Sequence, residues 1–240
     1  MRGILTLIFF LAAGLPLGNA ASAADSDHPT VVELFQSQGC SSCPPANAVL
    51  NAIAGRPGLL ALSFSVTYWD KLGWKDSYAL PAFTARQWEY SRAGGRGNVS
   101  TPQMIVNGRG VLVGSDRGEV ESFIRRFDRG ASGPRILAAA GRVTIAAGGS
   151  AGGAAGGSGR PANVWLVRYD PRVHQVAIRA GENQGRTLPH RNIVRSLALL
   201  GTWDGRAATF PIRAAADPGL RSAILVQDGP GGAILSARGL

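Results

Sequence analysis

Residues 31–45 read VVELFQSQGCSSCPP, and the interpretation of the whole chain starts from this stretch. It opens with an apolar run, Val31–Gln36, which is typical of a buried strand. Cys40 and Cys43 follow, and Pro44 begins a segment with apolar residues at helical spacing. The two cysteines of the chain therefore lie where a strand leads into a helix. Free amide groups and the positive end of a helix dipole stabilise a thiolate over a thiol, so this position predicts reactive cysteines.

The residues from Pro29 to about Asp128 predict one α/β unit. Hydrophobic periodicity and turn residues give strand, helix, strand, helix, strand, strand and helix in that order. The expected ranges are 31–36, 44–55, 59–66, 78–92, 103–106, 111–113 and 117–127. Such an order predicts a mixed sheet flanked by helices. It is also the element order of a minimal thioredoxin fold, with a helical insert after the second strand.

Thr101 and Pro102 directly precede the strand predicted at 103–106, and Asn107-Gly108 is typical of a tight hairpin turn after it. In thioredoxin-like proteins a pair of this kind lies beside the Cys-x-x-Cys motif and its proline peptide bond is cis. Only about 5% of X-Pro bonds in folded proteins are cis. Together with the upstream motif, however, the pair predicts a cis Pro102 and a thioredoxin-like domain over residues 29–131.

The character of the chain changes after Gly130. Short strand-like runs are expected at 142–146, 163–169, 173–180, 207–212, 223–227 and 233–237. They predict a smaller, mostly antiparallel β domain over residues 132–240. A Gly/Ala/Ser tract at 146–159 is interpreted as a flexible loop within it.

The N-terminus predicts export. Arg2 precedes an apolar stretch, Ile4–Leu17, and small residues around Ala21–Ala23 suit cleavage, so residues 1–24 are interpreted as a signal peptide. The apolar stretch is short for a membrane span, which needs about 20 residues. We expect a secreted or periplasmic protein without a stable membrane anchor once the signal is removed. An uncleaved anchor is the alternative.

The formal net charge is +10, but the arginines are scattered rather than clustered. Export and the absence of a basic block in the sequence argue against a nucleic-acid partner. A weak attraction to anionic surfaces is compatible with this charge.

The chain resembles a family of secreted bacterial proteins filed as domain of unknown function 1223. The resemblance covers nearly the whole mature chain and rests on residues 33–45, 69–76, 86–87, 101–103 and 181–188. It implies a thioredoxin-like fold and a redox role, but no substrate. Asn47 departs from the family, which usually carries Asp there. If that acid tunes the thiols or relays protons for them, this member works differently.

Within the motif, Cys40 is expected to be the exposed attacking sulfur and Cys43 the resolving one. The positive end of the helix dipole is expected to lower the pKa of the Cys40 thiol. Ser41, Ser42 and the Cys43 amide are candidate donors to a thiolate. Thr101 and Pro102, with Ser41 and Ser42, are expected to shape the partner groove. An inert disulfide on a binding module is the alternative interpretation, and two thiolates as part of a copper or zinc site is a weaker one.

Two polar regions have both a structural and a functional interpretation. Trp69, Asp70, Trp74, Asp76 and Tyr78 form an aromatic and acidic cluster in the insert. Packing of the insert, with the acids capping turns, is favoured over a wall of the groove. Arg86 is expected to pair with one of these acids.

The second region is Gly181–Asn192, which contains Glu182, Arg186 and His190. It is interpreted as a surface turn, with docking on the redox face as the alternative. His190 is interpreted as a surface histidine.

The sequence thus predicts an exported thiol-disulfide oxidoreductase that acts through Cys40 and Cys43. We expect no cofactor, no bound metal and a monomer, with protein thiols or disulfides of the cell envelope as partners. The second hypothesis is a non-catalytic envelope binding protein on a thioredoxin-like scaffold, because one fold hosts many functions.

Overall fold

The computed structural model describes residues 24–148 and 161–240. The predicted signal peptide lies outside the described residues except for Ala24, and so does the Gly/Ala/Ser tract from residue 149 onward. Among the described residues, no helix combines the length and the apolar character needed to cross a membrane.

The N-terminal part alternates strands and helices much as predicted. Its elements are β1 (Thr30–Gln36), α1 (Cys43–Ile53), β2 (Leu59–Ser65), a 3-10 turn η1 (Asp70–Leu72), α2 (Pro81–Ala93), β3 (Gln103–Val106), β4 (Gly110–Leu112) and α3 (Arg117–Arg126). β1 pairs with β2 in parallel and with β3 in antiparallel orientation, and β4 continues the antiparallel order. Asn107 and Gly108, both with positive φ, form the predicted turn between β3 and β4.

The C-terminal part is made of strands. They are β5 (Ile136–Ala139), β6 (Arg142–Ile145), β7 (Ala162–Asp170), β8 (His174–Ala177), β9 (Thr187–His190), β10 (Ile193–Trp203), β11 (Ala208–Pro211), β12 (Arg221–Gln227) and β13 (Ile234–Gly239). β5, β9 and β10 were not among the predicted strands. β6 pairs with β11, as expected from the interpretation of residues 142–146.

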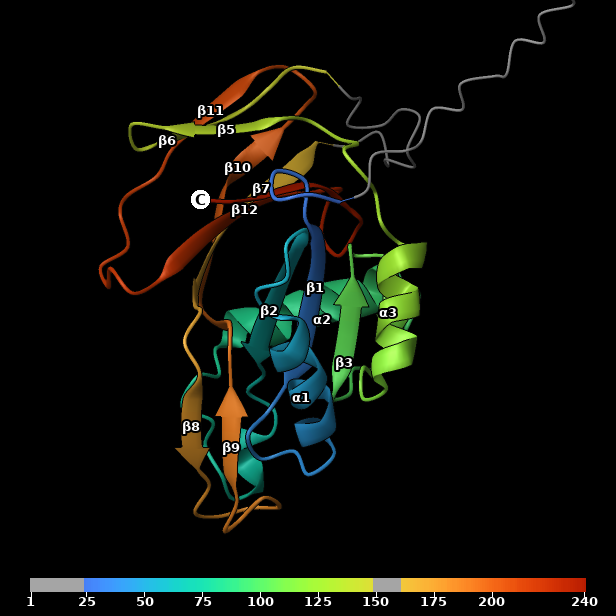
Figure 1. The fold of residues 1–240 in the computed structure, drawn as a ribbon, viewed down its shortest axis with the longest axis vertical. Coiled ribbons are helices and arrows are strands. Elements are labelled where there is room, and N and C mark those ends of the chain that lie inside the picture. The colour runs from blue at the N-terminus through green and yellow to red at the C-terminus, as the bar shows by residue number, and fades with distance from the viewer. Residues whose placement is uncertain (1–23, 149–160) are drawn as a thin grey trace, which may run out of the picture.

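A single eight-stranded mixed sheet joins the two parts in the order β13-β12-β7-β10-β2-β1-β3-β4. The junction is narrow, because β10 meets β2 through one residue pair, Ile193 and Ser63. A three-stranded antiparallel sheet, β11-β6-β5, packs on the C-terminal strands, and the β8–β9 hairpin extends toward the opposite end of the molecule (Figure 1). The expected mixed sheet flanked by helices and the smaller antiparallel sheet are thus both present.

Strand β1 explains the layers, because successive side chains of a strand point to opposite faces. Val32 and Leu34 pack with α1 and α3 in one core. Val31 and Phe35 face α2 in a second core. That second core also contains residues of β7, β10, β12 and β13, so strands distant in sequence are packed together.

The predicted boundary at residue 131 falls between α3 and β5. The large sheet and the core on its α2 face both extend across it. The division into two separate domains stays a prediction.

Helix α2 begins at Pro81 rather than at Tyr78. Leu80 is extended, with φ −131° and ψ 141°, because a residue that precedes proline is disfavoured in the helical region. Proline itself is well tolerated in the first turn, where its missing N–H has no helical partner.

Candidate functional site at the Cys40–Cys43 motif

Cys40 and Cys43 are joined by a disulfide at the start of α1. Cys43 is the first residue of the helix, and its amide donates to the Cys40 carbonyl at 3.2 Å. Both cysteines are 0% exposed. The expectation of an exposed Cys40 is therefore wrong for this disulfide form.

The two serines between the cysteines have different partners. Ser42 Oγ lies 3.3 Å from Cys40 Sγ and donates to the Thr101 carbonyl at 3.5 Å. Ser41 Oγ instead donates to Glu182 Oε2 at 2.6 Å. Of the two hydroxyls, only that of Ser42 is placed to donate to a thiolate at Cys40.

Thr101 and Pro102 lie beside the motif, as the sequence predicted. The Thr101–Pro102 peptide bond is cis, which confirms the expectation for Pro102. The Thr101 hydroxyl oxygen accepts from Trp69 Nε1 at 2.7 Å, while its carbonyl accepts from Ser42. Trp69 of the insert thus holds Thr101, and Thr101 in turn contacts the loop between the two cysteines. The role of these residues in a partner groove stays a prediction.

The insert supports the backbone that leads into the motif. The Gln38 amide donates to Asp76 Oδ2 at 2.8 Å, and Gln38 Oε1 accepts from Trp74 Nε1 at 2.9 Å. Asp76 Oδ1 accepts from the Tyr78 amide, and Asp70 accepts from the Asp76 amide. The acids therefore hold turns of the insert, as expected. Burial raises the pKa of Asp76, although these hydrogen bonds act in the other direction.

The loop between β8 and β9 covers the motif from the other side. Asn183 is fully buried, and its Nδ2 donates to the carbonyls of Gln38 at 2.9 Å and Cys40 at 2.8 Å. The neighbouring Glu182 Oε2 accepts from the Ser41 amide at 3.1 Å as well as from the Ser41 hydroxyl. These bonds from Ser41 hold the pKa of Glu182 below its usual value. The structure therefore places this region against the motif, as the docking alternative expected, and leaves the redox role of that face a prediction.

Arg186 and Gly181 hold the covering loop in shape. Arg186 Nη1 donates to Asn183 Oδ1 at 2.8 Å, which orients the Asn183 amide so that its NH₂ group points to the two carbonyls. Gly181 has φ +74° and lies against Trp74, where a Cβ atom would come within 3.2 Å of the Trp74 Cβ. Residues 181–186 are called the cover loop below.

A family model described as a protein of unknown function, DUF1223, matches residues 31–227. The chain belongs to this family. A crystal structure of the protein AGR_C_4864 from Agrobacterium tumefaciens is similar, with 32% sequence identity and a TM-score of 0.68, covering 88% of this chain and 93% of that one. HBP35 of Porphyromonas gingivalis is similar in fold, with 12% identity, a TM-score of 0.59 and coverage of 89% and 75%. The search among curated proteins found no match.

Asn47, the departure expected within the DUF1223 family, is buried on α1. Its Nδ2 donates to Gln36 Oε1 at 3.2 Å, and Gln36 Nε2 donates to Ser65 Oγ at 2.7 Å. An ionised Asp at position 47 would have no hydrogen to donate to the Gln36 oxygen. The amide therefore completes this buried chain of hydrogen bonds without a charge.

Two expectations about other residues of this DUF1223 protein are wrong. Arg86 pairs with Glu33 of β1, not with an acid of the insert, through bonds of 2.7 and 3.1 Å. The contact could not be inferred from spacing because 53 residues separate the partners, although a Glu within an apolar strand signals a buried partner. The Tyr90 hydroxyl also donates to Glu33, and Gln227 accepts from Arg86 at 3.0 Å.

His190 is buried, with 1% exposure, rather than a surface residue. Its ring packs edge-on against Tyr78, and neither ring nitrogen has a hydrogen-bond partner among the described residues. Burial, with a smaller contribution from His174, lowers the pKa of His190 to about 4. Within the part of the chain that the structure describes, no group of three or more His, Cys, Asp or Glu side chains is arranged to hold a metal ion.

Proposed function

We propose that this DUF1223 protein is an exported, thioredoxin-like thiol-disulfide oxidoreductase of the cell envelope. One observation carries the proposal: the Cys40–Cys43 disulfide lies at the start of α1 with the Ser42 hydroxyl 3.3 Å from Cys40 Sγ. A disulfide across two intervening residues closes too small a loop to contribute much stability through chain entropy. Thiol-disulfide exchange explains this pair better than stabilisation of the fold does.

The thioredoxin-like part of the proposal is supported by the N-terminal elements. Their order is β1, α1, β2, insert, β3, β4 and α3, with the motif between β1 and α1. Thr101 and Pro102 precede β3 and contact the motif through Ser42. These are the features that the family resemblance implies.

The proposed reaction is thiol-disulfide exchange with a protein partner. In the reducing direction, the Cys40 thiolate attacks one sulfur of a partner disulfide, forms a mixed disulfide and releases the partner's other sulfur as a thiolate. The Cys43 thiolate then attacks Cys40 Sγ and releases the second partner thiolate. The partner gains two electrons and ends as a dithiol, and the protein ends with the Cys40–Cys43 disulfide. The oxidising direction is the reverse of these steps.

We place an opening of the cover loop before exchange in either direction. A partner sulfur has to approach a Cys40 or Cys43 sulfur in line, and both cysteines are fully buried. The Asn183 and Glu182 contacts to residues 38–41 join the loop to the motif by hydrogen bonds alone, without a covalent link. Opening of the loop is therefore a step that precedes exchange in this proposal.

Trapping tests the proposal. In Cys43→Ser, the mixed disulfide at Cys40 has no internal thiol to resolve it, so reductant-sensitive adducts should accumulate in the envelope. Cys40→Ser and the double variant serve as controls and should form none. If Cys43→Ser yields no adducts beyond those of the double variant, the oxidoreductase proposal fails.

A non-catalytic binding protein is the second candidate, and burial of both cysteines favours it. On that proposal the disulfide only fixes the start of α1 beneath the cover loop. The discriminating measurement is alkylation of the reduced protein against pH. Equal and slow labelling of the two thiols supports the binding protein. Rapid labelling of Cys40 at pH values well below the free-thiol pKa of about 8.5 supports exchange.

A further inference from the structure

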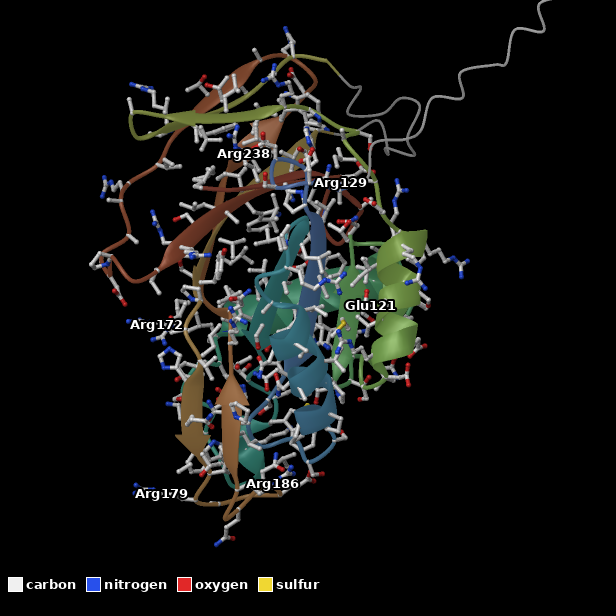
Figure 2. All side chains as sticks on the ribbon, in the orientation of Figure 1. Glu121, Arg129, Arg172, Arg179, Arg186 and Arg238 are labelled. Atoms are coloured by element: carbon white, nitrogen blue, oxygen red, sulfur yellow. A yellow bond between two sulfur atoms is a disulfide. The ribbon has the colours of Figure 1, made fainter. Side chains whose placement is uncertain are left out.

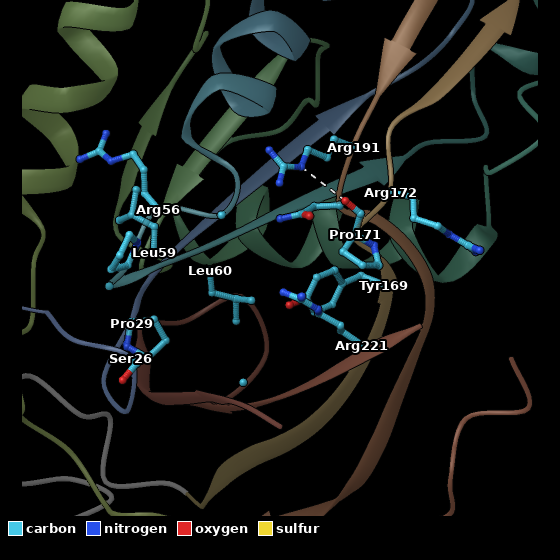
Figure 3. A pocket seen from close by; sticks show the side chains of 15 residues that line it. Ser26, Pro29, Arg56, Leu59, Leu60, Tyr169, Pro171, Arg172, Arg191 and Arg221 are labelled. Atoms are coloured by element: carbon cyan, nitrogen blue, oxygen red, sulfur yellow. Dashed lines mark hydrogen bonds between the residues drawn. The ribbon is translucent and has the colours of Figure 1, made fainter. Parts of the chain in front are cut away.

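A cavity of about 400 Å³ lies where the two parts of the large sheet meet. Its walls come from the turn around Ser26 and from residues 55–60, which lead from α1 into β2. The end of β7, the two residues before β10 and the first residue of β12 complete them (Figure 3). The cavity borders the C-terminal end of α1, whereas the cysteines lie at its start. Eleven residues of helix place these ends roughly 16 Å apart, so the cavity is separate from the motif.

The lining of the cavity is strongly basic. Four arginines contribute to it, Arg56, Arg172, Arg191 and Arg221, and no Asp or Glu does. Like charges gathered at one cavity repel one another unless acids neutralise them. The partners of each arginine therefore decide whether the site has a charge left for a ligand.

Two of the arginines are neutralised from outside the cavity. Arg56 pairs with Glu121, and Arg172 pairs with Asp170 at 2.7 Å. In Figure 3 the Arg172 side chain points away from the centre of the site.

The other two arginines have no ion pair with a carboxylate among the described residues. Arg191 donates through Nε to the Pro171 carbonyl at 3.4 Å, which leaves its two terminal nitrogens for other acceptors. Arg221 donates a hydrogen bond to the Tyr169 hydroxyl in the wall of the cavity, and this neutral partner leaves its charge in place (Figure 3). The acids that flank Ser26 are engaged elsewhere, since Asp25 pairs with His28 and Asp27 with Arg238.

The backbone makes room for Arg191. Gly55 has φ +91°, and a Cβ atom there would come within 3.0 Å of Arg191 Nη2. Absence of a side chain at position 55 therefore lets the guanidinium group lie directly against the chain at the cavity wall. The remaining wall is largely apolar and includes Leu59, Leu60 and Pro29.

We infer that this cavity binds a small organic anion, with a carboxylate held by Arg191 and Arg221 and a compact apolar body over Leu59, Leu60 and Pro29. Guanidinium groups bind carboxylates through paired, charge-assisted hydrogen bonds. A volume of about 400 Å³ is at the small end of ligand sites, which span roughly 300–1,000 Å³. It fits a ligand of one ring or a short branched chain.

Three probes separate the contributions of charge and apolar contact. Benzoate carries both, benzyl alcohol keeps the ring without the charge, and inorganic phosphate keeps the charge without the ring. Binding to the full chain is followed by amide chemical shifts, and saturable shifts at Gly55, Gly58 and Gly239 locate it in the cavity. Benzoate should bind at least about tenfold more tightly than either other probe.

Matched variants test the residues. Arg191→Gln and Arg221→Gln should each weaken benzoate binding about tenfold or more, the effect of losing a charge-assisted hydrogen bond. Arg179→Gln is the control, because Arg179 is exposed at the far end of the molecule (Figure 2), and it should leave binding unchanged. Absence of saturable binding of benzoate up to about 10 mM overturns the inference. So does equal binding of benzyl alcohol, or an equal loss in Arg179→Gln. These outcomes are independent of redox activity.

Discussion

Asn183 joins the cover loop to the backbone of the disulfide site. Its one amide group satisfies two buried carbonyls, those of Gln38 and Cys40, and Arg186 fixes its orientation. A buried carbonyl that loses its donor costs free energy unless water reaches it. Removal of the amide should therefore favour an open cover loop.

We expect Asn183→Ala to speed reduction of the Cys40–Cys43 disulfide by dithiothreitol under native conditions. Two neutral hydrogen bonds at about 1 kcal/mol each correspond to roughly a 30-fold increase in the open population. Gln184→Ala is the matched control, since Gln184 is an exposed neighbour in the same loop. Equal reduction rates for wild type and Asn183→Ala would show that the cover loop does not limit access.

His190 should make the fold sensitive to acid. An unfolded histidine binds a proton below pH about 6.5, but burial keeps His190 neutral in the folded protein until pH about 4. Between these values the unfolded state holds more protons, so the free energy of unfolding falls as the pH falls. The loss amounts to about 3 kcal/mol from this one residue.

Chemical denaturation at several pH values from 4 to 7 measures this loss. His190→Phe keeps a planar ring without a titrating group and should flatten the pH dependence in this window. His28→Gln, in which another histidine is replaced, should leave it in place. A wild-type slope that survives in His190→Phe contradicts the assignment.

The Glu33–Arg86 pair is buried, with both side chains 1% exposed. Burial opposes the charge on Arg86, but the attraction of Glu33 outweighs it and the pKa of Arg86 is raised. Arg86→Met would leave the Glu33 carboxylate buried without a cation, which costs about 3–5 kcal/mol of unfolding free energy. The double variant Glu33→Leu, Arg86→Met should recover much of this loss in urea denaturation. A loss below about 1 kcal/mol in Arg86→Met would contradict a buried ion pair.

At the scale of elements, the sequence predicts strands and turns correctly where short-range sequence patterns determine the structure. β2 is a continuous buried run, and the β3–β4 turn follows from Asn107 and Gly108. β10 was missed because its burial does not alternate. Its pairing with β7 shifts register between Val194 and Ser196 and again between Leu199 and Gly201, which breaks the two-residue period. β9 could not be predicted because it contains Pro189, and proline argues against a strand except at an edge.

The candidate site also has one part that the sequence predicts and one part that it does not. The Cys40–Cys43 pair, its place at the start of α1 and its contact with Thr101 could be predicted from motifs. The cover could not, because 143 residues separate Asn183 from Cys40 and no local pattern encodes that contact. The polar turn at 181–186 was recognisable only as a turn.

At the scale of the whole molecule, the shared core predicts that the two parts unfold together. Phe35 and Phe64 of the N-terminal part pack in the same cluster as Val167 and Leu225 of the C-terminal part. We expect calorimetry of residues 24–240 to give a single transition whose calorimetric and van't Hoff enthalpies agree. A protein ended at residue 131 should lack a cooperative transition, because it loses that half of the cluster. Two separate transitions in the full chain would instead support two independent domains.

The distance in sequence between the cysteines and the cover loop means that the two are synthesised at different times. A ribosome reaches Asn183 143 residues after Cys40 and 140 residues after Cys43. A newly made chain therefore passes through a stage in which both thiols are present and the cover loop has not yet been made. A Cys40–Cys43 disulfide formed in that interval is therefore made before Asn183 can bind the Cys40 carbonyl.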